Sequence, residues 1–161
     1  NQALIFDGTN DYMTMPDPLS GNPTTIDFTI SFWAYWFSSD SHVIFRDSTN
    51  SGSTLFLWDD SGTAKFRVGG TTSAVAGTTS EYEDTWLLLT LTNDRTTSKL
   101  YANGNLIGSL SPGSDPFVSP WRVARNGLIS KNYSKCLIDD IRFYNKALTL
   151  SEIQAIYNQG Q

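Results

Sequence analysis

An acidic residue in an apolar strand pattern is the first feature of this sequence with a chemical consequence. Asp139 lies on the side of an alternating segment that also carries Leu137 and Ile141. A carboxylate on the apolar side of a strand is costly to bury unless a hydrogen-bond donor or a cation satisfies it. The pattern therefore predicts a partner of one of these two kinds for Asp139.

Three tryptophans stand beside polar residues, a combination that is typical of sugar binding. An aromatic ring contacts the C–H face of a pyranose, while acids and amides bind its hydroxyl groups. The alternative for each tryptophan is a place in the hydrophobic core. The candidate ligand-binding residues are Trp58 with Asp59 and Asp60, Trp36 with Asp40, and Trp121 with Arg125.

The other side chains with possible chemical roles do not indicate a zinc site or an internal disulfide. The single histidine, His42, lies in a polar turn without the spaced cysteine, histidine or acidic residues that zinc requires. The single cysteine, Cys136, excludes an internal disulfide and is expected to pack as a small hydrophobic residue. Asn132 begins an Asn-Tyr-Ser tripeptide, which is a glycosylation acceptor only in a secreted eukaryotic protein.

Short alternating segments separated by turn residues must position these side chains. In the segment 26–37, Phe28 and Ile30 share one face, and Trp33 and Tyr35 share the other. Asn103-Gly104 between two apolar alternations predicts a hairpin with a type I′ turn. The expected strands are 3–6, 11–15, 26–37, 43–46, 54–58, 64–68, 86–92, the two arms of the 99–110 hairpin, 121–125 and 137–144, with a further outer strand in 71–84.

A helix is expected only at the end of the chain. Thr149 precedes Glu152 by three residues, which is the spacing of a capping box. Ile153, Ile156 and Tyr157 then fall on one helical face.

Composition and charge limit the class of protein. The chain has 161 residues, of which 39% are hydrophobic and 13% aromatic, and a chain of this size is expected to form one domain, residues 1–161. The net charge of −5 gives no basic surface for nucleic acid. No apolar run approaches the length of a membrane span. The abrupt start at Asn1 suggests a domain from a larger chain.

Several ordered motifs together resemble one family. LIFDGTNDYMTMP, FTISFWAYW, the Trp86 strand followed by KLYANGNLIGS, and LIDDIRFYNKALTLSEI occur in the order found in laminin-G-like domains of the concanavalin A-like lectin and glucanase superfamily. The resemblance covers nearly the whole chain and implies an all-β fold: a jelly-roll sandwich of two antiparallel sheets with a short C-terminal helix. It also implies that Trp33 and Trp86 are core residues.

The resemblance implies a structural calcium ion between the first turn and the last strand. The matching positions are Asp7, Gly8 and Asn10 in the turn and Asp139 in the strand. Calcium prefers six to eight oxygen ligands, which carboxylates and backbone carbonyls supply. The alternative is that Asp7 caps a tight turn and Asp139 accepts backbone N–H groups.

The acidic triplet of the superfamily's glucanases is absent. These enzymes carry acids at alternate positions of one strand, roughly Glu-x-Asp-x-Glu, for glycoside hydrolysis. The nearest pattern here is Glu81 and Glu83 with Asp84, which has no acid between the two glutamates. A non-catalytic protein is therefore expected.

Together these features predict a lectin-like, carbohydrate-binding module of a larger extracellular or surface-exposed protein, stabilised by calcium. The alternative is a protein-interaction or architectural module, of the adhesin or virion type, without a glycan ligand. Exposure of the aromatic residues in a common concave patch would distinguish the two.

Overall fold

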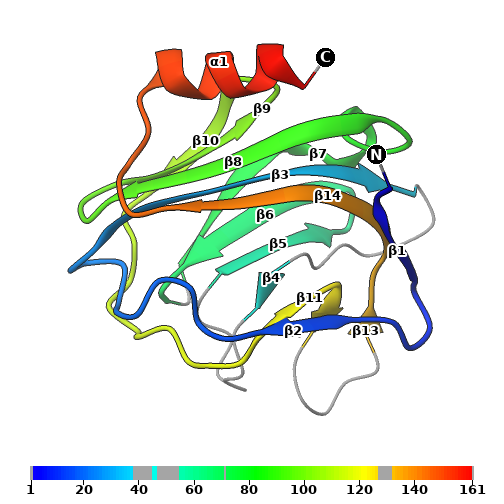
Figure 1. The fold of residues 1–161 in the computed structure, drawn as a ribbon, viewed down its shortest axis with the longest axis horizontal. Helices are drawn as coiled ribbons and strands as arrows, with labels where there is room; N and C mark the ends of the chain where they lie inside the picture. Colours follow the sequence, from blue (N-terminus) through cyan, green and yellow to red (C-terminus); the bar gives the residue numbers. More distant parts are fainter. Residues whose placement is uncertain (1, 38–44, 47–54, 71, 127–131, 161) are drawn as a thin grey trace.

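The chain folds into two packed layers of β-sheet with one helix on the outside (Figure 1). The computed structural model describes residues 2–37, 45–46, 55–70, 72–126 and 132–160, and within these ranges the side chains of residues 45, 46, 55–60, 126 and 132 are not described. The predicted all-β sandwich with a C-terminal helix is confirmed.

The larger layer is a six-stranded antiparallel sheet. Its strand order is β1 (Leu4–Asp7), β14 (Lys135–Tyr144), β3 (Asp27–Trp36), β8 (Trp86–Asp94), β9 (Ser98–Ala102) and β10 (Asn105–Leu110). The last strand of the sequence thus lies inside the sheet, between β1 and β3, as its long apolar pattern predicts.

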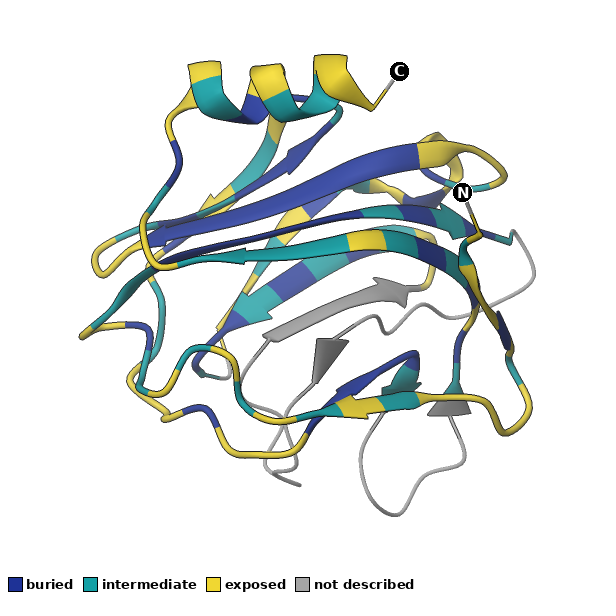
Figure 2. Cartoon of the chain, in the orientation of Figure 1, coloured by how far each residue is buried: buried dark blue, intermediate teal, exposed yellow. Residues whose placement is uncertain are grey.

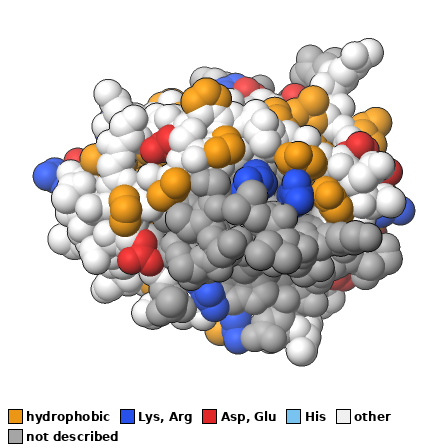
Figure 3. All heavy atoms as spheres, turned by 90° about the horizontal axis from the view of Figure 1, so that it is seen from below, with side chains coloured by type: hydrophobic (Ala, Val, Ile, Leu, Met, Phe, Trp, Pro, Cys, Tyr) orange, Lys and Arg blue, Asp and Glu red, His pale blue; other side chains and the backbone are white. Residues whose placement is uncertain are grey.

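The opposite layer consists of smaller sheets. One contains β5 (Leu55–Asp60), β6 (Thr63–Val68) and β7 (Ser73–Thr78), and a second contains β2 (Met13–Met15), β11 (Trp121–Val123) and β4 (Phe45–Arg46). A two-stranded pair joins β12 (Arg125–Asn126) to β13 (Asn132–Tyr133), and a short 3-10 helix, η1, covers Thr79–Glu81. Lys and Arg side chains lie beside hydrophobic ones on this face, which is opposite the helix (Figure 3).

The core fills the space between the two layers. Phe28, Ile30 and Phe32 of β3 point into it, as the alternation predicts, together with alternate leucines of β8. Phe66 of β6 contributes from the opposite layer. Most of β8 is buried because the helix and the segment leading to it cover part of its other face (Figure 2). Cys136 is also fully buried in this core, as expected.

Helix α1 (Leu150–Gln159) packs on the outer face of the six-stranded sheet. Its capping box is present: the Thr149 amide donates to Glu152, and the Glu152 amide donates to the Thr149 hydroxyl. Ile153 is completely buried and forms a second small core with Tyr101 and Leu148. No helix in the described ranges is long and apolar enough to span a bilayer.

The hairpin between β9 and β10 has the predicted turn. Asn103 and Gly104 both have positive φ angles, 51° and 77°, as a type I′ turn requires. The Asn103 side chain also accepts a hydrogen bond from the Leu88 amide at 2.9 Å, which ties the turn to the neighbouring strand β8.

Candidate functional site

An open cleft of about 700 Å³ lies on the outer face of the six-stranded sheet, beside the C-terminal end of α1. We call it the outer cleft. It combines two tryptophan rings with acidic, basic and amide side chains. Its lining residues are Trp33, Trp86, Asp139, Asp140, Arg142, Gln159 and Gly160.

The pairing of β3 with β8 places the two tryptophans. Trp33 and Tyr35 are on the outer face of β3, and the register sets Tyr35 opposite Trp86. Their rings meet edge to face, with centroids 5.9 Å apart. Trp86 is 39% exposed because α1 covers the sheet only up to the neighbouring Trp33. The implied core position of Trp86 is therefore wrong.

Trp33 is held between the sheet and the end of the helix. Its ring centroid lies 5.9 Å from that of Tyr157. A Cβ atom on Gly160 would approach the Trp33 ring to 2.7 Å, so only glycine permits this close contact. Trp33 is half-buried rather than a residue of the main core, and its contacts fix the helix end at the rim of the cleft.

A β-bulge in β14 brings Asp139 and Asp140 to the cleft. Ile138 is fully buried, so Asp139 faces outward beside Trp33, its register partner. The register then shifts between Asp139 and Arg142, and Asp140 adopts a positive φ of 52°. This shift returns Ile141 to the core side. The prediction that Asp139 shares the apolar face with Ile141 is wrong, because it assumed an unbroken alternation.

Hydrogen bonds and an ion pair determine which charged groups of the outer cleft already have a partner. Arg142 binds both oxygens of Asp140, with Nε 2.8 Å from Oδ1 and a terminal nitrogen 2.5 Å from Oδ2. This hydrogen bonding raises the pKa of Arg142. Asp139 Oδ1 accepts the Asp140 amide at 2.8 Å. Among the described residues, no cation pairs with Asp139, so the predicted partner is a backbone donor.

This arrangement can bind a ring with polar substituents. The exposed Trp86 ring offers an apolar face, the Asp139 carboxylate accepts hydrogen bonds, and the Gln159 amide both donates and accepts them. The sequence contained one signal for this site: Trp33 and Tyr35 are two residues apart in a strand, so their side chains lie on the same face. Only the register showed that Trp86 lies next to them.

Two of the predicted aromatic platforms are core residues. Trp36 is 2% exposed and packs edge to face on Tyr82, with centroids 6.2 Å apart. Trp121 is fully buried and packs edge to face on Phe117 at 5.1 Å. The expectation of exposed rings at both positions is wrong. Trp36 has the same parity in β3 as Phe32, and both side chains are buried in the core.

The other sugar-binding candidates remain apart from the outer cleft or outside the described structure. The side chains of Trp58, Asp59 and Asp60 in β5 are not described, and Asp40 lies outside the described residues. Arg125 is half-buried and stacks over the rings of Tyr12 and Tyr133, at 4.6 and 5.3 Å.

The implied calcium ligands do not converge. Asp7 pairs with Lys135 in the β1–β14 register, four residues from Asp139, which corresponds to about 13 Å along the strand. One calcium ion with ligands at about 2.3–2.6 Å cannot contact both carboxylates. Asp7 Oδ1 instead accepts the amides of Thr9 at 2.7 Å and Asn10 at 3.2 Å, and these bonds lower the Asp7 pKa. The implied joint site is therefore not formed.

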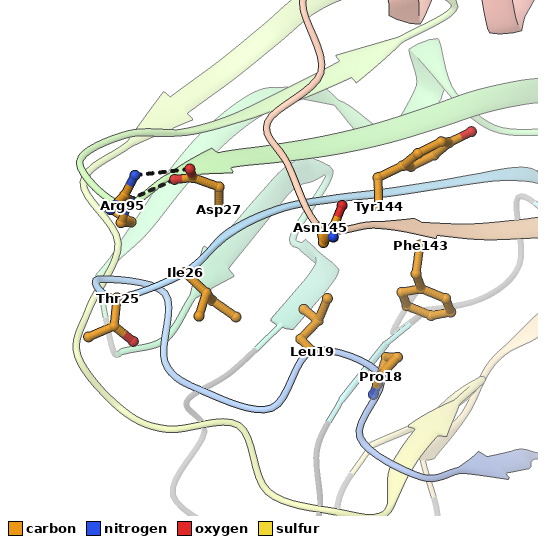
Figure 4. A pocket seen from close by; sticks show the side chains of 9 residues that line it. All are labelled: Pro18, Leu19, Thr25, Ile26, Asp27, Arg95, Phe143, Tyr144 and Asn145. Carbon is orange, nitrogen blue, oxygen red and sulfur yellow. Dashed lines mark hydrogen bonds and ion pairs between the residues drawn. The ribbon is translucent and has the colours of Figure 1, made fainter.

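A second groove, of about 600 Å³, lies at the far end of β14 (Figure 4). Leu19, Ile26 and Phe143 form an apolar part, and Asp27 and Arg95 form an ion pair at its edge, with Asp27 Oδ1 2.8 Å from Arg95 Nε. This pair satisfies its own charges, and the other polar residues that line the groove are Thr25, Tyr144 and Asn145.

Comparison with known proteins places the fold in a family. A family model for the concanavalin A-like lectin/glucanases superfamily, Laminin_G_3, matches residues 7–154. No curated protein matches the sequence.

Solved structures with a similar fold include toxin binding domains. The binding domain of Paraclostridial Mosquitocidal Protein 1 has a TM-score of 0.72 at 18% identity, with 98% of this chain and 46% of that chain covered. The botulinum neurotoxin serotype D binding domain has a TM-score of 0.75 at 17% identity, with 96% and 41% covered. The same serotype D domain is known in complex with N-acetylneuraminic acid, at a TM-score of 0.72, 18% identity and the same coverage. The chain thus spans less than half the length of these structures.

Proposed function

The chain belongs to the concanavalin A-like lectin/glucanase superfamily, and from this premise we propose that it is a non-catalytic module that binds carbohydrate in the outer cleft. The observation that carries the proposal is the exposed ring of Trp86 beside the carboxylate of Asp139 and the amide of Gln159. An exposed ring next to hydrogen-bonding groups matches the two sides of a sugar.

The solved structures support a binding role, although they are too distant in sequence to transfer a ligand. The serotype D domain is known with N-acetylneuraminic acid, and a type C neurotoxin structure is described as interacting with two ganglioside molecules. A module that spans less than half of such a chain fits a place within a larger extracellular or surface-exposed protein.

A protein partner is the alternative function, and one surface feature favours it. Ile5, Leu137, Tyr35 and Trp86 are paired in register and form one row across the outer face of the sheet. Ile5 is 72% exposed, which is unusual for an isoleucine at a strand centre. A related toxin binding domain is known in complex with rat synaptotagmin II.

Calorimetric titration of the wild type and of Trp86→Ala with a panel of oligosaccharides tests the proposed function. We expect the variant to bind at least about tenfold more weakly, because removal of a central aromatic contact costs more than about 1.4 kcal/mol. Its melting midpoint should fall by only a few degrees, since the ring is partly exposed.

Two control variants separate binding from stability. Leu106→Ala removes an exposed apolar side chain in β10 and should leave sugar binding unchanged. Trp121→Ala removes a fully buried ring and should cost about 3–5 kcal/mol of stability. Absence of binding to every sugar, with the wild type folded, would refute the glycan proposal and favour a protein partner.

A further inference from the structure

The charges of the outer cleft indicate which kind of sugar it can accept. Asp139, Asp140 and Arg142 contribute two negative charges and one positive charge. Both oxygens of Asp140 are bound to Arg142, so this guanidinium is already engaged with a carboxylate. Asp139 is left with a negative charge that no described side chain neutralises.

The end of helix α1 adds negative potential to the same place. Gln159 and Gly160, the last helical residue and its cap, line the cleft. The carbonyl end of a helix carries roughly half a negative charge, which a basic residue in the last turn can offset. The last turn of α1 contains no basic residue. A bound cation would therefore be favoured at this end of the cleft.

The two tryptophans favour the same charge. A cation over the face of an indole ring is attracted by the ring electrons, and tryptophan is the strongest of the aromatic residues in this respect. Trp33 and Trp86 both line the cleft, and Trp86 is 39% exposed. Three independent features, the Asp139 carboxylate, the helix end and the indole rings, thus attract a positive group and repel a negative one.

We infer that the outer cleft selects glycans that carry a free amine, such as glucosamine units, over neutral sugars, and excludes acidic sugars. This inference rests on the proposed function. In the bound state the ammonium group of the sugar would pair with the Asp139 carboxylate while the sugar ring lies against Trp86. The expected selectivity differs from that of the serotype D toxin domain, which is known with an acidic sugar, N-acetylneuraminic acid.

The test compares ligands that differ in charge but have the same sugar ring. Glucosamine oligomers, N-acetylglucosamine oligomers of equal length and N-acetylneuraminic acid are titrated into the protein by calorimetry, at a mildly acidic pH that keeps the amine protonated. We expect the glucosamine oligomer to bind about fivefold more tightly than its acetylated form, because a charge-assisted hydrogen bond is roughly twice as strong as a neutral one. The acidic sugar should show no binding.

Asp139→Asn is the diagnostic variant. Asparagine keeps an oxygen for the Asp140 amide but removes the charge, so the ratio of the affinities for the glucosamine oligomer and its acetylated form should fall to about one, whatever the change in the affinity for each of them. Asp115→Asn makes the same change of charge in the exposed loop between β10 and β11, and it should keep the full preference. Melting curves of both variants confirm that they are folded.

The possible failures are distinct. Equal or tighter binding of the acetylated or acidic sugar by the wild type would overturn the amine preference and leave the glycan-binding function standing. A preference that survives in Asp139→Asn would also overturn it, because the charge would then not be the cause. No binding of any sugar would refute the proposed function, and the inference with it.

Discussion

At the scale of single residues, exposure divides the tryptophans into different roles. Trp36 and Trp121 are core residues, whereas Trp86 is exposed and Trp33 is half-buried at the end of α1. All four lie in strands, so neither residue type nor secondary structure distinguishes them. Trp121 is buried in the opposite layer, and the three tryptophans of the six-stranded sheet differ because the two faces of that sheet are covered differently.

Glu152 provides a residue-scale prediction for the pH dependence of stability. Its hydrogen bond with Lys146, followed by those with Thr149, lowers its pKa from 4.5 to about 2. A lowered pKa in the folded state means that the ionised form stabilises the fold above the unfolded pKa. This contribution is lost as the pH falls from about 4.5 to about 2.

The measurement is a series of melting curves across that pH range for the wild type and for Glu152→Gln. We expect the wild type to lose more stability than the variant as the pH falls, because the variant has no carboxylate to protonate. Parallel pH profiles for the two proteins would show that the Glu152 contacts do not contribute in solution.

At the scale of elements, α1 determines the shape of the outer cleft. Its apolar face is anchored by Ile153, and its last residues contact Trp33 through Gly160. The bulge in β14 supplies the opposite side of the cleft, with Asp139 and Asp140. The site therefore depends on one helix end and one strand irregularity.

The capping box of α1 gives an element-scale prediction. Thr149→Ala removes the acceptor for the Glu152 amide and should cost about 0.5–2 kcal/mol of stability. Because α1 positions its last residue, Gln159, and its cap, Gly160, at the outer cleft, sugar binding should weaken in parallel. Denaturant titration and calorimetry on the same samples provide the measurement.

Thr149→Ser is the matched control, since serine retains the capping hydroxyl and should restore both stability and binding. A loss of stability in Thr149→Ser equal to that in Thr149→Ala would mean that the hydroxyl is not the relevant group.

At the scale of the whole molecule, sheet register decides which distant residues meet. The β1–β14 register sets Asp7 opposite Lys135, and the β3–β14 register sets Asp139 opposite Trp33. The two acids that the family resemblance linked through calcium are therefore separated along one strand. Stabilisation by calcium stays a prediction, but not one that uses both carboxylates together.

Melting curves with calcium and with a chelator test this separation in the wild type, Asp7→Asn and Asp139→Ala. We expect Asp139→Ala to leave any calcium-dependent shift of the midpoint unchanged. An ion at a hundredfold over its dissociation constant would stabilise the fold by about 2.7 kcal/mol, which is several degrees for a domain of this size. A calcium effect that disappears in Asp7→Asn and also in Asp139→Ala would contradict the register.

The sequence by itself determined the local structure. Period-two alternation identified β3 and β14, a dense apolar run identified β8, the Asn103-Gly104 pair gave the hairpin turn, and Thr149 with Glu152 fixed the start of α1. These features could be predicted because each depends on residues that are close together in the chain. The order of motifs also indicated the family, and hence the sandwich.

Only the tertiary structure decided the site. Both faces of β3 carry large aromatic residues, so alternation alone could not show that Trp36 faces the core and that Trp33 faces the outer cleft. The exposure of Trp86 depends on where α1 ends, and the position of Asp139 depends on a bulge that reverses the alternation. These features arise from contacts between segments far apart in the chain, and a period-two pattern contains no information about them.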